Sequence, residues 1–242
     1  MSISLSDLSF TGSILIAFLA LLHSSFQLGT SVLTLLNGHS ISRKVATRRL
    51  AALNMAYIVG VIGATGSIIA VVTAVLYTWL PYDLVQPLWL LLIGWASIVG
   101  WLVMALYFRK GRGTRLWLPR DFAEYLTNRA SHTKNTVEAF ALGLITAIAE
   151  LPFTLVIILM VSLTLVSTLY VDSYALIIAL YSIAVCLPLI AVGALAAGGH
   201  RLSTIQRWRE SSKVFLQYAA GVGLIAAAVY ALAYFVIIKD AP

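Results

Sequence analysis

Charged side chains are scarce in this chain of 242 residues. Only 10% of the residues are Asp, Glu, Lys or Arg, and 61% are hydrophobic, whereas a soluble domain carries about 25% charged residues. This scarcity excludes an ordinary water-facing surface and indicates that lipid covers most of the protein. The apolar runs are also too long and unbroken for barrel strands, which alternate polar and apolar residues over about 10 positions. The sequence therefore predicts an all-α polytopic membrane protein.

Cysteine is nearly absent, because Cys186 is the only one. A single cysteine excludes an internal disulfide, a paired thiol relay and a multi-cysteine metal site, and in an apolar helix it most often serves packing. No lysine lies inside an apolar run, which excludes a retinal Schiff base, and a single deep histidine argues against bis-histidine haem. We therefore expect no cofactor and no bound metal.

Six apolar runs are each long enough, at about 20 residues or more, to cross a bilayer. No positively charged segment precedes the first run, so we expect it to be a membrane helix rather than a cleaved secretory signal. The runs cover approximately residues 10–36, 50–76, 88–108, 139–166, 174–197 and 215–238.

Basic residues are confined almost entirely to alternate loops. All but one of the 16 Lys and Arg residues fall between runs one and two, three and four, or five and six, and only Lys239 lies elsewhere. Cytoplasmic loops hold the excess of Lys and Arg, so we expect an integral multi-pass protein of the plasma (inner) membrane with both termini outside. The same rule explains the net charge of +7 without nucleic acid as a partner.

The longest loop divides the chain into a first half at 1–108, a cytoplasmic basic linker at 109–138 and a second half at 139–242. Each half holds three runs, and an odd number inserts the second half upside down relative to the first, which is the inverted-repeat layout of many secondary transporters. Within the linker, Phe122, Tyr125 and Leu126 recur at helical spacing. This short helix would lie on the membrane surface or belong to a plain hinge held near anionic lipid.

An acidic residue, Glu150, interrupts the fourth apolar run, and Pro152 follows it two residues later. A charged group at the bilayer centre costs at least about 2.5–3.5 kcal/mol on insertion scales, so it is retained where a cavity, a partner or a function compensates. The proline removes a backbone donor and loosens the helix. This pattern predicts that Glu150 lies at the centre of a transport or relay site.

The first half offers one counterpart, His23. It lies about 20 Å along a helix from Phe10, and Glu150 lies about 17 Å from Ala139 at the opposite face, so both fall near the middle of a hydrocarbon core of about 30 Å. His23 and Glu150 are therefore candidate partners in a proton or cation relay. A buried neutral histidine bonded to a carbonyl is an equally economical reading of His23.

Uncharged polar residues surround these two positions, and we include them, with Pro152, as candidates for binding a solute or ion. Gly29 and Pro152 would break their helices and free carbonyl groups to line a cavity. The alternative is that the hydroxyl groups join neighbouring helices. The polar candidates are Ser24, Ser25, Gln27, Thr146 and Thr154.

Two segments carry a family resemblance: ALGLITAIAELP at residues 141–152, and the basic stretch from Gly199 into the glycine-containing last run. They resemble the lysine exporter (LysE) and DsbD/CcdA-like superfamily of six-helix membrane proteins. The resemblance implies a transporter of two three-helix repeats. The thiol branch of this superfamily has a cysteine beside a proline in the first and fourth helices, where this chain has none, so thiol electron transfer is excluded. The proline–glycine motifs of the export branch are absent too, so the resemblance names no substrate.

The leading hypothesis is a small secondary transporter, an exporter of a small solute or ion, in which Glu150 couples proton or cation movement. The alternative is a non-transporting membrane scaffold or assembly factor that binds a partner through its basic loops. We expect no enzyme, because the adjacent His23 and Ser24 point about 100° apart on a helix and make a poor hydrolase pair. The expected partners are the bilayer and the solute, and a homo-oligomer stays open.

Overall fold

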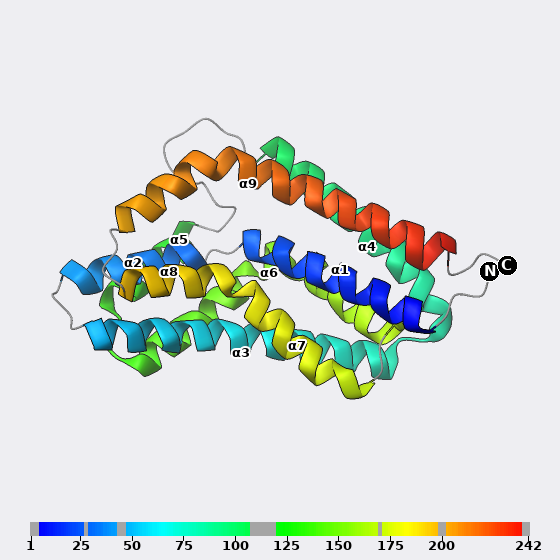
Figure 1. The fold of residues 1–242 in the computed structure, drawn as a ribbon, viewed down its shortest axis with the longest axis horizontal. Helices are drawn as coiled ribbons and strands as arrows, with labels where there is room; N and C mark the ends of the chain where they lie inside the picture. The colour runs from blue at the N-terminus through cyan, green and yellow to red at the C-terminus, as the bar shows by residue number, and fades with distance from the viewer. Residues whose placement is uncertain are drawn as a thin grey trace.

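The computed structural model describes residues 5–26, 29–42, 47–106, 120–168, 171–197 and 202–238, and this part of the chain is helical almost throughout, without a strand. The predicted all-α class is confirmed. Figure 1 shows the helices gathered into one elongated bundle. Their bounds are α1 Leu5–Ser25, α2 Gly29–Ser42, α3 Thr47–Trp79, η1 Tyr82–Leu84, α4 Val85–Leu106, α5 Arg120–His132, α6 Thr136–Thr168, α7 Val171–Val185, α8 Leu187–Ala197, α9 Leu202–Ala231 and η2 Leu232–Ile238.

Three helical segments of the described chain are long and apolar enough to cross a membrane unbroken: Arg48–Trp79, Tyr82–Ala105 and Gln217–Ile237. Three further helix pairs pass the same test but are bent, by 45° between α1 and α2, by 90° within α6, and by 47° between α7 and α8. The protein therefore has three candidate spans, or six if each bent pair crosses once. The six apolar runs of the sequence coincide with these segments.

The three interruptions lie at residues that weaken helices. Gly29 begins α2, Pro152 lies inside α6 at its bend, and Pro188 follows the turn at Cys186. Gly29 and Pro152, the two residues predicted to break helices, lie at two of these interruptions, and α6 remains helical through its bend at Pro152. At two of the interruptions the backbone tightens before it turns, because Phe26 N donates to His23 O at 3.1 Å and Cys186 N donates to Ile183 O at 3.0 Å. Such three-residue spacing is typical of a helix end.

Close packing of α3 on α6 and of α4 on α9 dominates the bundle. Glycines allow both crossings: a side chain at Gly60 would collide with the backbone at Phe140, and one at Gly143 with the backbone at Tyr57. At the second crossing, a Cβ atom on either Gly100 or Gly221 would lie 2.8 Å from the other's carbonyl oxygen. Backbones approach this closely only where side chains are missing.

Two other glycines do not take part in packing. An added Cβ at Gly63 or Gly94 would meet nothing within 4 Å. A glycine in an apolar run identifies a crossing only when its side of the helix faces a neighbour, which the sequence alone does not give.

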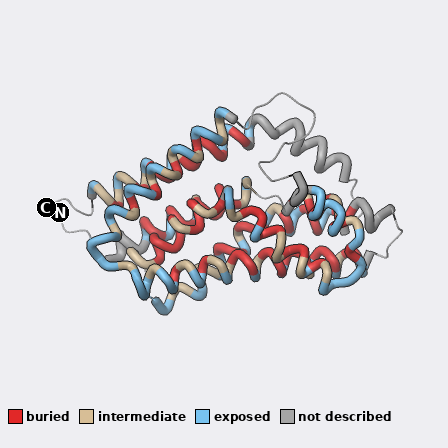
Figure 2. Tube along the Cα trace, turned by 180° about the vertical axis from the view of Figure 1, so that it is seen from behind, coloured by how far each residue is buried: buried red, intermediate tan, exposed pale blue. Residues whose placement is uncertain are grey.

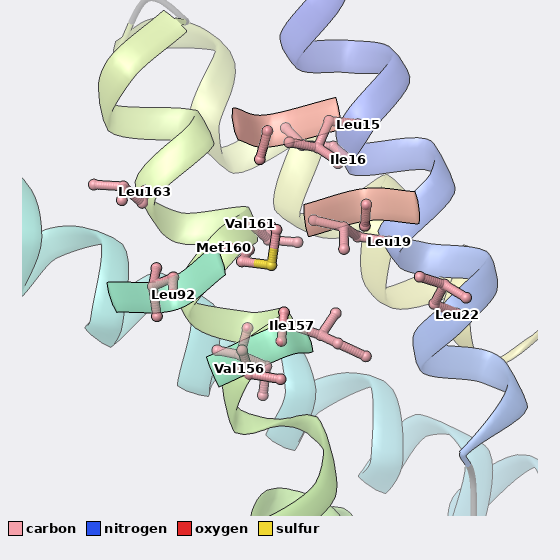
Figure 3. Close-up of a cluster of buried hydrophobic side chains, with 14 of the residues drawn as sticks. Leu15, Ile16, Leu19, Leu22, Leu92, Val156, Ile157, Met160, Val161 and Leu163 are labelled. Atoms are coloured by element: carbon pink, nitrogen blue, oxygen red, sulfur yellow. The ribbon is translucent and has the colours of Figure 1, made fainter. Parts of the chain in front are cut away.

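Buried apolar side chains form two clusters, and Figure 2 shows the buried residues on the inner sides of the helices. The first cluster joins α1, α3, α4, α6, α7, α9 and η2, and in Figure 3 Leu15 and Leu19 of α1 point toward Met160 and Val161 of α6. The second cluster joins α2, α3, α5, α6 and α8. The bends lie where the chain passes from one cluster to the other.

The short linker helix, α5, packs on protein. Its Leu126 and Ala130 are buried in the second cluster while Tyr125 is exposed, and α5 contacts α2 and α6. Arg49 Nη2 donates to Lys134 O at 2.8 Å, which ties the start of α3 to the end of the linker. The buried side of α5 therefore faces the bundle and not a membrane surface. Residues 107–119, which hold the first basic residues of the linker, lie outside the described residues.

Candidate functional site

Glu150 lies inside the protein. Its side chain is 2% exposed, on the turn of α6 just before Pro152, and Thr146 precedes it by one turn and is also fully buried. A carboxyl group in this position is shielded from acyl chains by the surrounding helices. The Glu150 side chain is therefore surrounded by other groups of the protein and does not contact lipid.

The surrounding polar groups come from α3 and from the turn between α7 and α8. The Tyr57 hydroxyl of α3 hydrogen-bonds the side chain of Thr146 and lies within electrostatic range of Glu150 and Cys186. Tyr57 and Cys186 are both fully buried, in the second apolar cluster. We name Tyr57, Thr146, Glu150 and Cys186 the Glu150 cluster. Its members come from three neighbouring segments, and an apolar shell encloses them.

His23 has a different partner. It lies on the last turn of α1, 3% exposed, and its Nδ1 atom is 2.9 Å from the hydroxyl oxygen of Tyr181 on α7. The two rings lie 5.9 Å apart between centroids, at an interplanar angle of 58°. Either group can donate in this bond, depending on the histidine tautomer. The bond satisfies one ring nitrogen of a buried histidine.

The structure thus places His23 and Glu150 in two neighbouring groups, and α7 connects them. Tyr181 packs in the first apolar cluster, whereas Tyr57 and Cys186 pack in the second. Tyr181 precedes Cys186 by five residues, or about 7.5 Å along a helix. His23 and Glu150 thus have different neighbours, and a relay between them stays a prediction.

The remaining predicted site residues do not join the Glu150 cluster through their hydroxyl donors. Ser24 Oγ donates to Leu21 O at 2.7 Å and Ser25 Oγ donates to Leu22 O at 2.6 Å. Thr154 Oγ1 is buried and donates to Glu150 O at 3.0 Å. Hydrogen bonds of this kind satisfy a hydroxyl within its own helix.

Ser25 and two further predicted residues, Pro152 and Gln27, differ in exposure and placement. Ser25 and Pro152 are exposed, so neither side chain points into the protein. Gln27 lies outside the described residues. Thr146 makes two hydrogen bonds through its hydroxyl group. It donates to Leu142 O at 2.7 Å, and it bonds the hydroxyl of Tyr57.

Sequence reasoning missed Tyr57 and Tyr181, and it treated Cys186 as packing. One signal was available. Tyr57 and Tyr181 lie within apolar runs, whereas Tyr77, Tyr82 and Tyr174 lie at their ends, where tyrosine favours the membrane interface. A tyrosine away from the interface needs a partner for its hydroxyl, and here the partners are Thr146 and His23.

Within the described residues, no three His, Cys, Asp or Glu side chains lie close enough together to hold a metal ion. No protein family, curated protein or solved structure matches this chain.

Proposed function

We propose that this protein is a small secondary transporter, an exporter of a small solute or ion, in which Glu150 binds and releases the coupling proton or cation. The observation that carries the proposal is the burial of Glu150 at 2% exposure between membrane-type helices. An intramembrane carboxylate is expensive and typically marks an ion pathway. The proposal agrees with the resemblance to the exporter superfamily.

The interrupted helices support the same function. Transporters bind substrates where discontinuous helices from two inverted halves meet. Here the first span of each half is interrupted, between Ser25 and Thr30 in the first half and at Pro152 in the second. His23 in the first half and Glu150 in the second each lie within three residues of the interruption. The α7–α8 turn has no counterpart in the continuous α3, so the halves differ in their second spans.

The pattern of helix contacts supports an inverted repeat. In such a repeat, α1–α2 would be equivalent to α6, α3 to α7–α8, and α4 to α9. The observed contacts agree with this exchange. The contact of α3 with α6 corresponds to that of α7 with α1, and the contact of α4 with α6 corresponds to that of α9 with α1. The α4–α9 contact maps onto itself. Such exchange is expected of two related halves that pack around a pseudo-two-fold axis, with both chain termini outside.

The test measures proton exchange in everted membrane vesicles that hold the protein. Respiration first acidifies the vesicle lumen. If an added solute then enters the lumen in exchange for protons, the fluorescence of a pH-sensitive acridine dye is restored. We would add Na⁺, K⁺, and basic and neutral amino acids in turn. We expect at least one of them to restore fluorescence with the wild type, and Glu150→Gln to lose the response.

Glu124→Gln is the matched control, because Glu124 is exposed on α5, and it should behave as the wild type. Both variants must insert in equal amount. A Glu150→Gln variant that responds with unchanged pH dependence would overturn the role of Glu150. A wild type that responds to no solute of the panel would count against transport and favour the scaffold alternative.

A further inference from the structure

Two buried asparagines on α2 and α3 share an unusual feature. Asn37 is 0% exposed and Asn54 is 3% exposed, and the carboxamide oxygen of each has no hydrogen-bond donor among the described residues. A buried acceptor without a donor destabilises the folded state. Such an oxygen therefore calls for an occupant that can interact with it.

The orientation of both carboxamides is fixed by their nitrogen atoms. Asn37 Nδ2 donates to Leu33 O at 2.9 Å, and Asn54 Nδ2 donates to Gly193 O of α8 at 3.4 Å. Turning either amide over would set its oxygen against a carbonyl oxygen. The unpaired atoms are therefore true acceptors and do not arise from an exchanged oxygen and nitrogen.

The two asparagines lie toward the same end of the bundle. In Figure 1, α2 and α8 end where α3 begins, and α2, α3 and α8 contact one another pairwise. Asn37 lies five residues before the end of α2, Asn54 seven residues after the start of α3, and Gly193 four residues before the end of α8. These offsets correspond to about 7.5, 10.5 and 6 Å along the helices.

The Glu150 cluster lies one turn deeper. Asn54 precedes Tyr57 by three residues on α3, so the two buried side chains share a face of the helix, about 4.5 Å apart along its axis. A ligand between the asparagines would thus lie next to the group that contains the carboxylate. Arg48 and Arg49 begin the same helix but are exposed, where water screens their charge.

We propose that Asn37 and Asn54 form a binding position for a monovalent cation, an alkali-metal ion or a primary ammonium group. Neutral amide and carbonyl oxygens coordinate such ions in transporters, whereas a divalent ion would demand more carboxylates. The inference rests on the proposed function in naming a cation as the transported class. It places this position on the cytoplasmic side of Glu150.

The test is cation-dependent thermal unfolding of the full chain, purified in detergent, at constant ionic strength. Sodium, potassium or methylammonium chloride would replace choline chloride, whose cation is too large and offers no N–H donor. We expect the unfolding midpoint to rise saturably with at least one of the three cations. The cation that acts tells an alkali-metal ion from an ammonium group.

Variants assign the effect to the asparagines. Asn37→Leu and Asn54→Leu should each raise the half-saturating concentration about ten-fold or abolish the effect, the weakening expected when one polar ligand is lost. Asn54→Asp keeps an oxygen and adds a negative charge, so it should lower that concentration, and it serves if Asn54→Leu does not fold. Asn128→Leu, on the exposed surface of α5, is the control.

An equal midpoint in all four salts would overturn the inference, and so would leucine variants that keep the wild-type cation dependence. These outcomes differ from failure of the proposed function. If Glu150→Gln alone abolishes both the cation effect and transport, the asparagine site is wrong and the transporter stands. If Glu150→Gln transports normally, the coupling role of Glu150 is wrong whatever the asparagines bind.

Discussion

The bond between His23 and Tyr181 shows how one buried titratable residue is tolerated. Its imidazole is enclosed by α1 and α7, and the tyrosine hydroxyl at 2.9 Å supplies a partner for one ring nitrogen. The pair also joins the last turn before the α1–α2 interruption to α7. Its role is thus at least structural, and a proton path through it would use the same hydroxyl.

Tyr181→Phe should destabilise the protein by about 1 kcal/mol, because it leaves the His23 Nδ1 atom without its partner in a buried site. The measurement is thermal unfolding in detergent. Tyr77→Phe is the matched control, since Tyr77 is 59% exposed and should unfold as the wild type does. Equal midpoints for all three proteins would show that the His23–Tyr181 bond contributes nothing to stability.

Single residues also show how far sequence reasoning reached at the site. Glu150 stood out because a carboxylate within an apolar run is anomalous on its own, and the structure places it in the protein interior. Tyr57 and Asn54 did not stand out, because a tyrosine or an asparagine in such a run has many harmless explanations. Their partners, Thr146 and Gly193, lie far away in sequence, and only the packing of α3 on α6 and α8 brings them together.

At the scale of elements, the start of α6 is held by a reciprocal cap. Asn135 Oδ1 accepts from the backbone N–H of Glu138 at 2.8 Å, and Glu138 Oε2 accepts from the backbone N–H of Lys134, also at 2.8 Å. The two bonds satisfy donors that a helix terminus otherwise leaves open. The hydrogen bond from the Lys134 backbone holds the pKa of the Glu138 carboxyl below its usual value of 4.5.

The cap should therefore weaken at acidic pH. A carboxyl whose pKa is lower in the folded than in the unfolded state stabilises the fold above the unfolded value, and that contribution is lost as pH falls through the folded value. We expect the Lys134 amide to lose hydrogen-exchange protection below about pH 4.5, after correction for the intrinsic exchange rate. In Glu138→Gln the protection at neutral pH should already be lower and change little with pH, and a wild-type amide that stays protected would contradict this.

The α3–α6 crossing offers a second test at the scale of elements. Gly60→Ala would place a methyl group against the backbone at Phe140, and such overpacking typically costs about 1–3 kcal/mol. Gly63 lies one turn away on the same helix with nothing within 4 Å of its Cβ position. Gly63→Ala should therefore be neutral or stabilise by up to about 1 kcal/mol through helix propensity. Thermal unfolding distinguishes the two, and equal effects would mean that the backbones do not meet at Gly60.

For the whole molecule, hydropathy alone predicted where the apolar helices lie, because a bilayer sets one length scale for all of them. Hydropathy could not show that half of the candidate spans are interrupted, since an apolar residue scores the same on either side of a bend. Gly29 and Pro152 hinted at two bends. The turn at Cys186 was less evident, because Pro188 allows a kink, a break or the first turn of a new helix.

Whether the bent pairs cross the membrane decides the topology of the molecule. If α6 crosses despite its bend of 90°, its two ends lie on opposite sides, and the α3–α4 turn lies on the same side as the start of α7. If α6 enters and returns, the start of α7 lies on the same side of the membrane as α5. Asp83 in η1, Asn128 in α5 and Asp172 in α7 are exposed and report on these three places.

Single cysteines at these positions distinguish the two topologies, because the native Cys186 is 0% exposed and gives little background. A membrane-impermeant maleimide added to spheroplasts should label Asp83→Cys and Asp172→Cys at once, and Asn128→Cys only after the membrane is opened. This pattern requires an odd number of crossings between residues 128 and 172, which one α6 span provides. If Asp172→Cys is labelled only together with Asn128→Cys, α6 is re-entrant, and the two halves cannot be inverted repeats of three spans each.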